Sequence, residues 1–320
     1  MTTADSLAQL IPQAAAYLKG RVRRTPLEFS PALTELLGVP VWLKLESLQL
    51  TGSFKIRGAL FRLSLLTEQE RRDGALTCSA GNHGKAVAYA ARKMGVRIAI
   101  CVPKSVDRAK HDGMLALGAD VRVSDFDGYD ETEEWARKMA ADEARTFISG
   151  FDDYAIMAAN GGTVALEVVE DAPSARTFVL PVGGGGLSAG FAYAVHPSRI
   201  VACQHALSPA LRLSLDSGSA VTKLPAVETM AGGIEGGIGA LTFPVLAPRL
   251  DRVALVTEDE IVEGVQWMLA HHQYLIEPTA AVTVAACLSG KIGELHDPTV
   301  VVISGRNVSA DTVKKILCRS

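Results

Sequence analysis

One lysine stands at a position where its amine could act as a nucleophile. The segment TGSFKIRGA (51–59) places Lys55 at the start of an expected helix. An ammonium group there faces the positive end of the helix dipole, which disfavours the charged form and lowers the pKa of the amine. The neutral amine can form a Schiff base with an aldehyde. A solvated lysine beside a loop is the competing interpretation, and position alone favours it.

A second turn offers backbone donors for an anion. The segment SAGNHG (79–84) follows an apolar run and opens an alanine-rich stretch. The N–H groups at the start of a helix form a site sized for a carboxylate or a phosphate. A turn of small residues is more often a plain tight connection, and His83 alone is equally typical of a capping or packed histidine. The ligand interpretation therefore needs support from elsewhere in the chain.

A third turn contains four successive glycines, 183–186, after an apolar run that ends at Val182. Four glycines leave the backbone N–H groups accessible to a ligand, and no buried packing role requires four glycines in a row. A bound anion therefore explains the run better than a flexible connection does. The dinucleotide pattern needs an acid about 20 residues later, where Gln204 and His205 stand, and the Lys-Ser/Thr ending of a P-loop is missing. A monophosphate therefore fits best.

The elements around these turns alternate in type. Short β-branched runs are followed by longer Ala/Leu-rich stretches with helical periodicity, which predicts parallel sheets covered on both faces. Such sheets bind ligands at the carboxyl ends of their strands, where all three turns lie. The expected strands are 41–46, 75–79, 96–102, 120–125, 176–182 and 299–304, and the helices between them include 56–66, 105–117 and 130–144.

Composition excludes several classes of protein. Hydrophobic residues make up 48% and charged residues 21% of the 320 residues, as in globular domains. A net charge of −3 without a basic block predicts no nucleic-acid partner and no membrane partner. No apolar stretch spans a bilayer, the N-terminus lacks an export signal, and the five cysteines form no close pairs. We therefore expect a cytoplasmic protein.

A Schiff-base lysine, a carboxylate nest and a monophosphate cradle together suggest pyridoxal 5′-phosphate. Five segments also resemble, in order and spacing, the fold-type II pyridoxal-phosphate enzymes of the serine/threonine dehydratase and serine racemase group: SFKIRGA (53–59), SAGNHG (79–84), VGGGGL (182–187), EPTAA (277–281) and SGRN (304–307). The resemblance implies a tryptophan synthase β-like α/β fold with two domains, each a mostly parallel sheet covered by helices. It implies a large cofactor-binding domain over 1–73 and 150–320 and a small mobile domain over 74–149.

The resemblance also assigns roles to residues. Lys55 would hold the cofactor and later remove the α-proton of the substrate, Phe54 would pack on the cofactor ring, and Ser304 would lie against the ring nitrogen. Asn82 would bind the ring hydroxyl. Backbone amides would hold the phosphate at Gly183, Gly184, Gly185, Gly186 and Leu187. The substrate would be bound by the turn of Ser79, Ala80, Gly81, Asn82 and His83.

The implied reaction is β-elimination from a β-hydroxy amino acid, such as L-threonine or L-serine, to a 2-oxo acid and ammonia. A neutral hydroxyl at Ser304 suits elimination better than transamination. An amino-acid racemase acting on serine or aspartate is the nearest alternative, and a non-catalytic cofactor-binding or sensing protein is an alternative of another class. A β-replacing synthase is less favoured. The relatives imply a small amino-acid substrate and a homodimer.

Several residues depart from the pattern of the group. Racemases carry a second serine where this chain has Ala80, which has no proton to donate, so we expect chemistry on one face of the cofactor. The acids that bind a divalent cation in some relatives correspond to Gln204, Ser208 and Ala210, so no metal site is expected.

Other departures concern the substrate side chain. Gly161 and Gly232 replace polar residues, and five glycines between 232 and 239 predict a pliable or open wall, suited to a β-hydroxy acid other than threonine. Arg306 replaces the commoner second glycine of SGGN. It either pairs with a surface acid or reaches toward a second carboxylate of the substrate.

Overall fold

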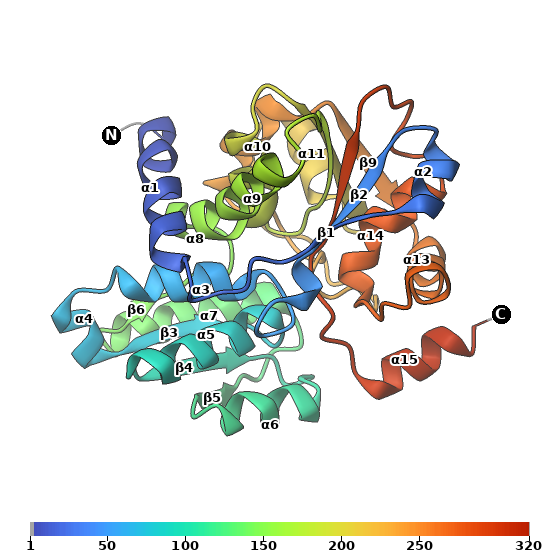
Figure 1. Cartoon of the computed structure of the whole chain (residues 1–320). Helices are drawn as coiled ribbons and strands as arrows, with labels where there is room; N and C mark the ends of the chain where they lie inside the picture. The colour runs from blue at the N-terminus through green and yellow to red at the C-terminus, as the bar shows by residue number, and fades with distance from the viewer. Residues whose placement is uncertain (1–2, 320) are drawn as a thin grey trace.

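The computed structural model describes residues 3–319 and contains two β-sheets (Figure 1). The larger sheet has the strand order β1-β2-β10-β7-β8-β9, and the smaller has the order β5-β4-β3-β6. Strands β1 and β2 pair antiparallel, and every other pair is parallel. The strands are β1 Leu27–Phe29, β2 Val41–Leu45, β3 Ala75–Cys78, β4 Ile98–Val102, β5 Asp120–Val123, β6 Thr146–Phe147, β7 Thr177–Pro181, β8 Arg199–His205, β9 Arg252–Val256 and β10 Thr299–Ile303.

Helices fill the connections between the strands. The α-helices are α1 Thr3–Leu18, α2 Pro31–Leu37, α3 Lys55–Ser64, α4 Glu68–Asp73, α5 Asn82–Met94, α6 Arg108–Ala116, α7 Tyr129–Asp142, α8 Tyr154–Met157, α9 Thr163–Asp171, α10 Gly186–Ala194, α11 Ala210–Ser217, α12 Thr242–Leu246, α13 Glu258–His272, α14 Pro278–Leu288 and α15 Ala310–Leu317. A π-helical turn, η2 (Ala158–Gly162), joins α8 to α9, and 3₁₀ turns occupy η1 (Glu46–Leu48) and η3 (Ala247–Arg249).

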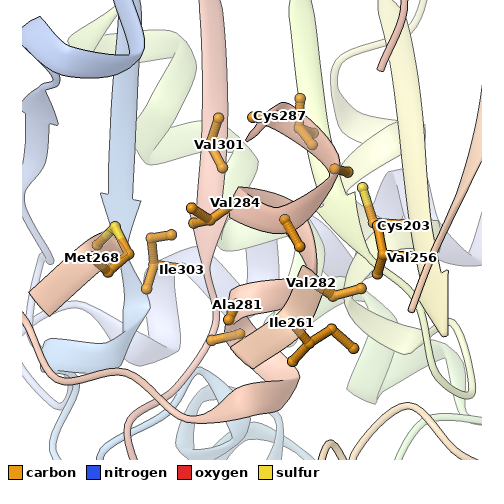
Figure 2. Packing of buried hydrophobic residues seen from close by; sticks show 14 of the residues in the cluster. Cys203, Val256, Ile261, Met268, Ala281, Val282, Val284, Cys287, Val301 and Ile303 are labelled. Carbon is orange, nitrogen blue, oxygen red and sulfur yellow. The ribbon is translucent and has the colours of Figure 1, made fainter. Parts of the chain in front are cut away.

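The larger sheet is buried on both faces, as near-continuous apolar strands require. Along β10, Val301 and Ile303 join one cluster of buried side chains, whereas Val300 and Val302 join the cluster on the opposite face. Helix α14 lies wholly within the first cluster, packed against α13 and the sheet (Figure 2). Burial of one Val, Leu or Ile side chain stabilises the fold by roughly 1.5–3 kcal/mol.

The smaller sheet is covered in the same way. Helix α7 packs on one face, and α5 with α3 contributes to the cluster on the other. Helix α3 also packs against α8, next to the larger sheet's helices (Figure 1). The residue that starts α3 therefore lies near elements of both sheets.

The predicted fold class is correct, and the expected strands end within two residues of the observed ones. Four strands, β1, β6, β8 and β9, were not among the expected ones. Of these, β1 and β6 span three and two residues, too few to show a period. Among residues 3–319, no helix is long and apolar enough to cross a membrane.

Candidate active site

A cavity of about 780 Å³ lies where strands of both sheets end. Its walls include the residues that directly follow β3 and β10 and the turn after β7. Every site residue predicted from the sequence lines it: Phe54, Lys55, Ser79, Ala80, Gly81, Asn82, His83, Gly183, Gly184, Gly185, Gly186, Leu187 and Ser304. The fold thus brings together segments up to 250 residues apart, as expected for the carboxyl edge of parallel sheets.

Lys55 is placed by contacts between its loop and the end of β10. An antiparallel bridge joins Ser53 to Gly305, and the Phe54 N–H donates to the Ser304 carbonyl at 3.2 Å. Helix α3 starts at Lys55, whose Nζ donates to the Gly150 carbonyl at 2.6 Å. Burial lowers the pKa of Lys55 from 10.5 to about 8, although the nearby carboxyl of Glu277 opposes this shift. The expected lowering of the pKa is therefore present, with burial as its main cause.

The first turn of α3 is anchored in the interior. The Arg57 guanidinium donates to Glu46 Oε1 at 2.8 Å and to Glu167 Oε1 at 2.7 Å. The Gly58 N–H donates to the Asn160 side chain in η2 at 2.7 Å. A helix start tied by charge-assisted bonds to residues on other elements gives the Lys55 side chain a defined origin.

The glycine turn between β7 and α10 offers free donors. No described residue accepts a hydrogen bond from the N–H groups of Gly183, Gly184 or Gly185. The Gly184 carbonyl is held by Thr242 Oγ1 at 2.7 Å and by the Gly239 N–H at 3.1 Å. A turn whose carbonyl is bonded away from the cavity while its amides stay free suits an anion.

Close packing also requires these glycines, contrary to the expectation that no packing role does. A Cβ at Gly184 would lie 2.3 Å from the Phe151 ring, and one at Gly183 would lie 2.4 Å from the Gly233 carbonyl. Gly185 has a φ of +92°, which disfavours any side chain. The run is therefore explained by packing and by ligand approach together.

His83 is a buried residue in the first turn of α5. Its side chain is 4% exposed, and Nε2 lies 3.0 Å from Thr77 Oγ1. Burial, followed by the charge of Lys55, lowers the pKa of His83 from 6.5 to about 3, so the ring is neutral at physiological pH. The packed-histidine interpretation describes its environment. In the same segment, Ser79 Oγ accepts from the Gly81 N–H at 3.2 Å and shapes the turn.

Sequence reasoning did not assign the residues that contact Asn82. Asn82 Nδ2 donates to Glu277 Oε1 at 2.6 Å, and Asn82 Oδ1 accepts from Asn307 Nδ2 at 2.6 Å. Both partners stand in recognised motifs, EPTAA and SGRN, which were the available signal. Gly150 and Phe151 also line the cavity, but no sequence pattern marks them.

The glycines that were expected to shape the substrate side of the cavity are mostly required by packing instead. Gly161 lies outside the cavity lining, and a Cβ there would be 2.0 Å from the Leu187 carbonyl, so packing against α10 requires glycine. Gly237 and Gly239 are likewise closed in, with Cβ positions 2.0 Å from Thr222 and 2.2 Å from Asp152. The expectation of an open wall is wrong at these positions. Among the five glycines of 232–239, only Gly232 is both exposed and placed so that an added Cβ would make no more than an ordinary van der Waals contact.

The residues that align with the metal-binding acids of some relatives have structural partners in this chain. Gln204 Oε1 accepts from the Leu211 N–H at 3.0 Å, and Ser208 Oγ accepts from the Gly236 N–H at 3.1 Å. Within 3–319, no group of three or more His, Cys, Asp or Glu side chains could hold a metal ion. Arg306 is exposed at the cavity and forms no ion pair with a described residue.

The donor set fits pyridoxal phosphate. Ser304 Oγ is buried without a hydrogen-bond partner among the described residues and could meet a ring nitrogen. Lys55 offers an amine of lowered pKa for an aldehyde, and the glycine turn offers free amides for a phosphate. A family model described as pyridoxal-phosphate dependent enzyme matches residues 18–305. The chain belongs to this family.

Relatives of this pyridoxal-phosphate dependent enzyme include lyases and racemases. It is 37% identical to an L-threonine ammonia-lyase of Geobacter sulfurreducens over 97% of this chain and 78% of the relative. A threonine deaminase structure from Solanum lycopersicum matches with a TM-score of 0.88 and 28% identity, covering 98% of this chain and 88% of that one. A Dictyostelium discoideum serine racemase matches with a TM-score of 0.85 and 31% identity, covering 94% and 98%. The predicted family, fold class, cofactor and ammonia-lyase class are confirmed.

Proposed function

We propose that this enzyme removes water and ammonia from a β-hydroxy amino acid, such as L-threonine or L-serine, and releases a 2-oxo acid. The observation that carries the proposal is the Lys55 amine, which lies in the shared cavity with a pKa lowered to about 8. At pH 7 about one such amine in ten is neutral, compared with fewer than about one in a thousand for an ordinary lysine. The lyase relatives support the same reaction.

The bound cofactor supplies the electron sink that makes the α-proton acidic. Lys55 would hold the cofactor in the resting enzyme and would accept the α-proton of the substrate during turnover. The Ser304 hydroxyl would meet the ring nitrogen, and Phe54 would pack against the ring. Backbone amides of 183–187 would hold the phosphate, and the turn 79–83 would receive the substrate carboxylate. Asn82 would bind the ring hydroxyl.

The same proposal includes a domain movement. Residues 74–149 form a small domain that closes on the large domain formed by 1–73 and 150–320. Closure presses the turn that holds Ala80 onto the substrate and excludes water. The placement of this turn at the end of β3 in the smaller sheet, and of the glycine turn at the end of β7 in the larger one, supports such a movement.

The decisive experiment measures 2-oxo acid release by the cofactor-loaded enzyme. The substrates are L- and D-serine, L-threonine, 3-hydroxyaspartate and 3-phenylserine. Release from at least one is expected, and Lys55→Ala should abolish both that release and the absorbance of the lysine-bound cofactor. Lys93→Ala, at an exposed lysine on α5, is the matched control and should retain both. Turnover retained in Lys55→Ala, or no release from any substrate, contradicts the proposal.

A racemase is the second candidate, supported by the likeness to serine racemase. Ala80 opposes it, because a methyl group cannot return a proton to the second face of the substrate. Chiral chromatography of the product mixture separates the two reactions. The lyase predicts 2-oxo acid without the opposite enantiomer, whereas a racemase predicts the enantiomer without 2-oxo acid.

We also propose that the enzyme is a cytoplasmic homodimer. Cys78, Cys101, Cys203 and Cys287 are buried free thiols, and Cys318 is an exposed one, as suits a reducing compartment. The family resemblance supports the dimer. Light scattering of the holoenzyme tests it directly, with the mass of one chain as the contrary result.

A further inference from the structure

The carboxyl group of Glu277 connects the two sheets beside the cavity. Glu277 stands at the N-terminus of α14, and its side chain lines the cavity while the residue is 6% exposed. Its Oε1 accepts from Asn82 Nδ2 at 2.6 Å, and its Oε2 accepts from the Asn307 N–H at 3.1 Å. Asn82 starts α5, next to the smaller sheet, whereas Asn307 follows β10 of the larger one. Both carboxylate oxygens are thus used, one toward each sheet.

The local backbone makes room for this carboxyl. A Cβ at Gly305 would lie 2.3 Å from Glu277 Oε1 and 3.2 Å from Asn82 Nδ2, so a side chain there would displace both. The Asn307 amide group also donates to the Thr51 carbonyl at 2.8 Å, just before the loop that leads to Lys55. Glu277 is therefore held in place from several elements.

These bonds determine the orientation of Asn82. Its Oδ1 accepts from Asn307 Nδ2 at 2.6 Å, and one Nδ2 hydrogen goes to Glu277. An amide group has two N–H donors, so one remains for a ligand in the cavity. Without Glu277, the amide could turn and present its oxygen instead.

Several charged groups surround Glu277. Burial raises the pKa of Glu277 to about 7, while Lys110 on α6 and Lys85 on α5 favour the charged form. The negative charge of Glu277 in turn raises the pKa of Lys55 on α3 and so favours the protonated form of that amine. Arg306 lies near Lys85 and disfavours the charge of that lysine. A negative charge at Glu277 is thus coupled to the amine that would hold the cofactor.

We propose that Glu277 is a positioning residue that orients Asn82 toward the cofactor ring oxygen and places a negative charge in the cavity that it shares with Lys55. This role rests on the cofactor site of the proposed function, but it does not depend on which amino acid is the substrate. It predicts two separate effects of removing the carboxylate. One effect is on the affinity for the cofactor, and the other is on the pH at which the lysine-bound cofactor loses its proton.

The test uses holoenzyme variants and the absorbance of the bound cofactor as a function of pH. Glu277→Gln should lower the midpoint of that titration by on the order of one pH unit, because an opposite charge nearby favours the protonated form. Glu277→Asp keeps the charge and should shift the midpoint less. The matched control is Glu235→Gln, at a second cavity carboxyl that bonds neither asparagine. It should shift the midpoint less than Glu277→Gln does.

A double-mutant cycle tests the orientation of Asn82. The dissociation constant of the cofactor is measured for Glu277→Gln, Asn82→Ala and the double variant. In the Asn82→Ala background, Glu277→Gln should weaken cofactor binding much less than it does in the wild type, because both substitutions remove the same hydrogen bond. Strict additivity contradicts the orienting role.

The outcomes separate this inference from the proposed function. An unchanged midpoint in Glu277→Gln, or an equal shift in Glu235→Gln, overturns the role of Glu277. A shifted midpoint in an enzyme that releases no 2-oxo acid overturns the proposed reaction and leaves the role standing. If Glu277→Gln does not fold, the comparison of Glu277→Asp with wild type decides: a wild-type midpoint together with wild-type cofactor affinity contradicts the role.

Discussion

Arg57 donates two hydrogen bonds to Glu46, at 2.8 and 2.9 Å, and neither side chain is more than 1% exposed. Arg57 lies two residues after Lys55, and its pairing with Glu46 anchors the helix that carries both Arg57 and Lys55. A buried pair is costly to break from one side, because the remaining charge has lost its partner.

Glu46→Ala should therefore destabilise the protein strongly. Removal of one partner of a buried pair typically costs about 3–5 kcal/mol, and Glu167 compensates only part of the Arg57 charge. Urea unfolding of the apoprotein measures the change. Arg24→Ala, which breaks ion pairs of the half-exposed Arg24 side chain with Glu170 and Asp171, is the control and should cost less than about 1 kcal/mol. Equal costs for the two variants would refute a special role for the buried pair.

Gly184→Ala should weaken cofactor binding. The added methyl group would meet the Phe151 ring at 2.3 Å, so either the ring or the turn must move. Overpacking of this kind costs about 1–3 kcal/mol, which corresponds to roughly 5- to 150-fold in the dissociation constant if the displaced turn bears the cost. Fluorescence titration of the apoprotein measures it. Gly113→Ala on α6, where a Cβ meets nothing within 4 Å, should bind the cofactor normally.

His83 should make the protein sensitive to acid. The pKa of His83 in the folded protein is about 3, below its ordinary value of 6.5. Between pH 3 and pH 6.5, His83 is therefore protonated in the unfolded chain but neutral in the folded protein. The stability due to neutral His83 is thus complete above pH 6.5, falls as the pH drops, and is lost near pH 3. The full loss is on the order of several kcal/mol.

Urea unfolding at several pH values tests this effect. His83→Asn should lower stability at pH 8 yet lose less than wild type between pH 6.5 and pH 4. His296→Asn, at an exposed histidine, should follow the wild-type profile. Parallel profiles for wild type and His83→Asn would show that His83 does not set the acid limit.

Arg306→Gly should change substrate preference. The Arg306 side chain lines the cavity without an ion-pair partner among the described residues, which leaves its charge available to a substrate. An exposed ion pair contributes at most about 1 kcal/mol, so kcat/KM for 3-hydroxyaspartate should fall by up to roughly fivefold. The value for L-threonine, which has no second carboxylate, should stay near wild type. Unchanged kinetics for every substrate would remove this role of Arg306.

The sequence by itself determined the fold class and the main turns of the site. Apolar runs with strand character and stretches of helical period depend on local backbone geometry, so β10 and the start of α3 at Lys55 were predictable. The glycine run marked its own turn because only glycine tolerates the φ of +92° at Gly185.

Tertiary structure decided which groups meet. Lys55 bonds Gly150, 95 residues away, and Asn82 bonds Glu277, 195 residues away, and no local pattern encodes such pairs. The burial that lowers the pKa of His83, and the Phe151 ring that closes on Gly184, likewise depend on how distant elements pack. Local propensity places a residue on an element, but electrostatics and close packing depend on neighbours that only the folded chain supplies.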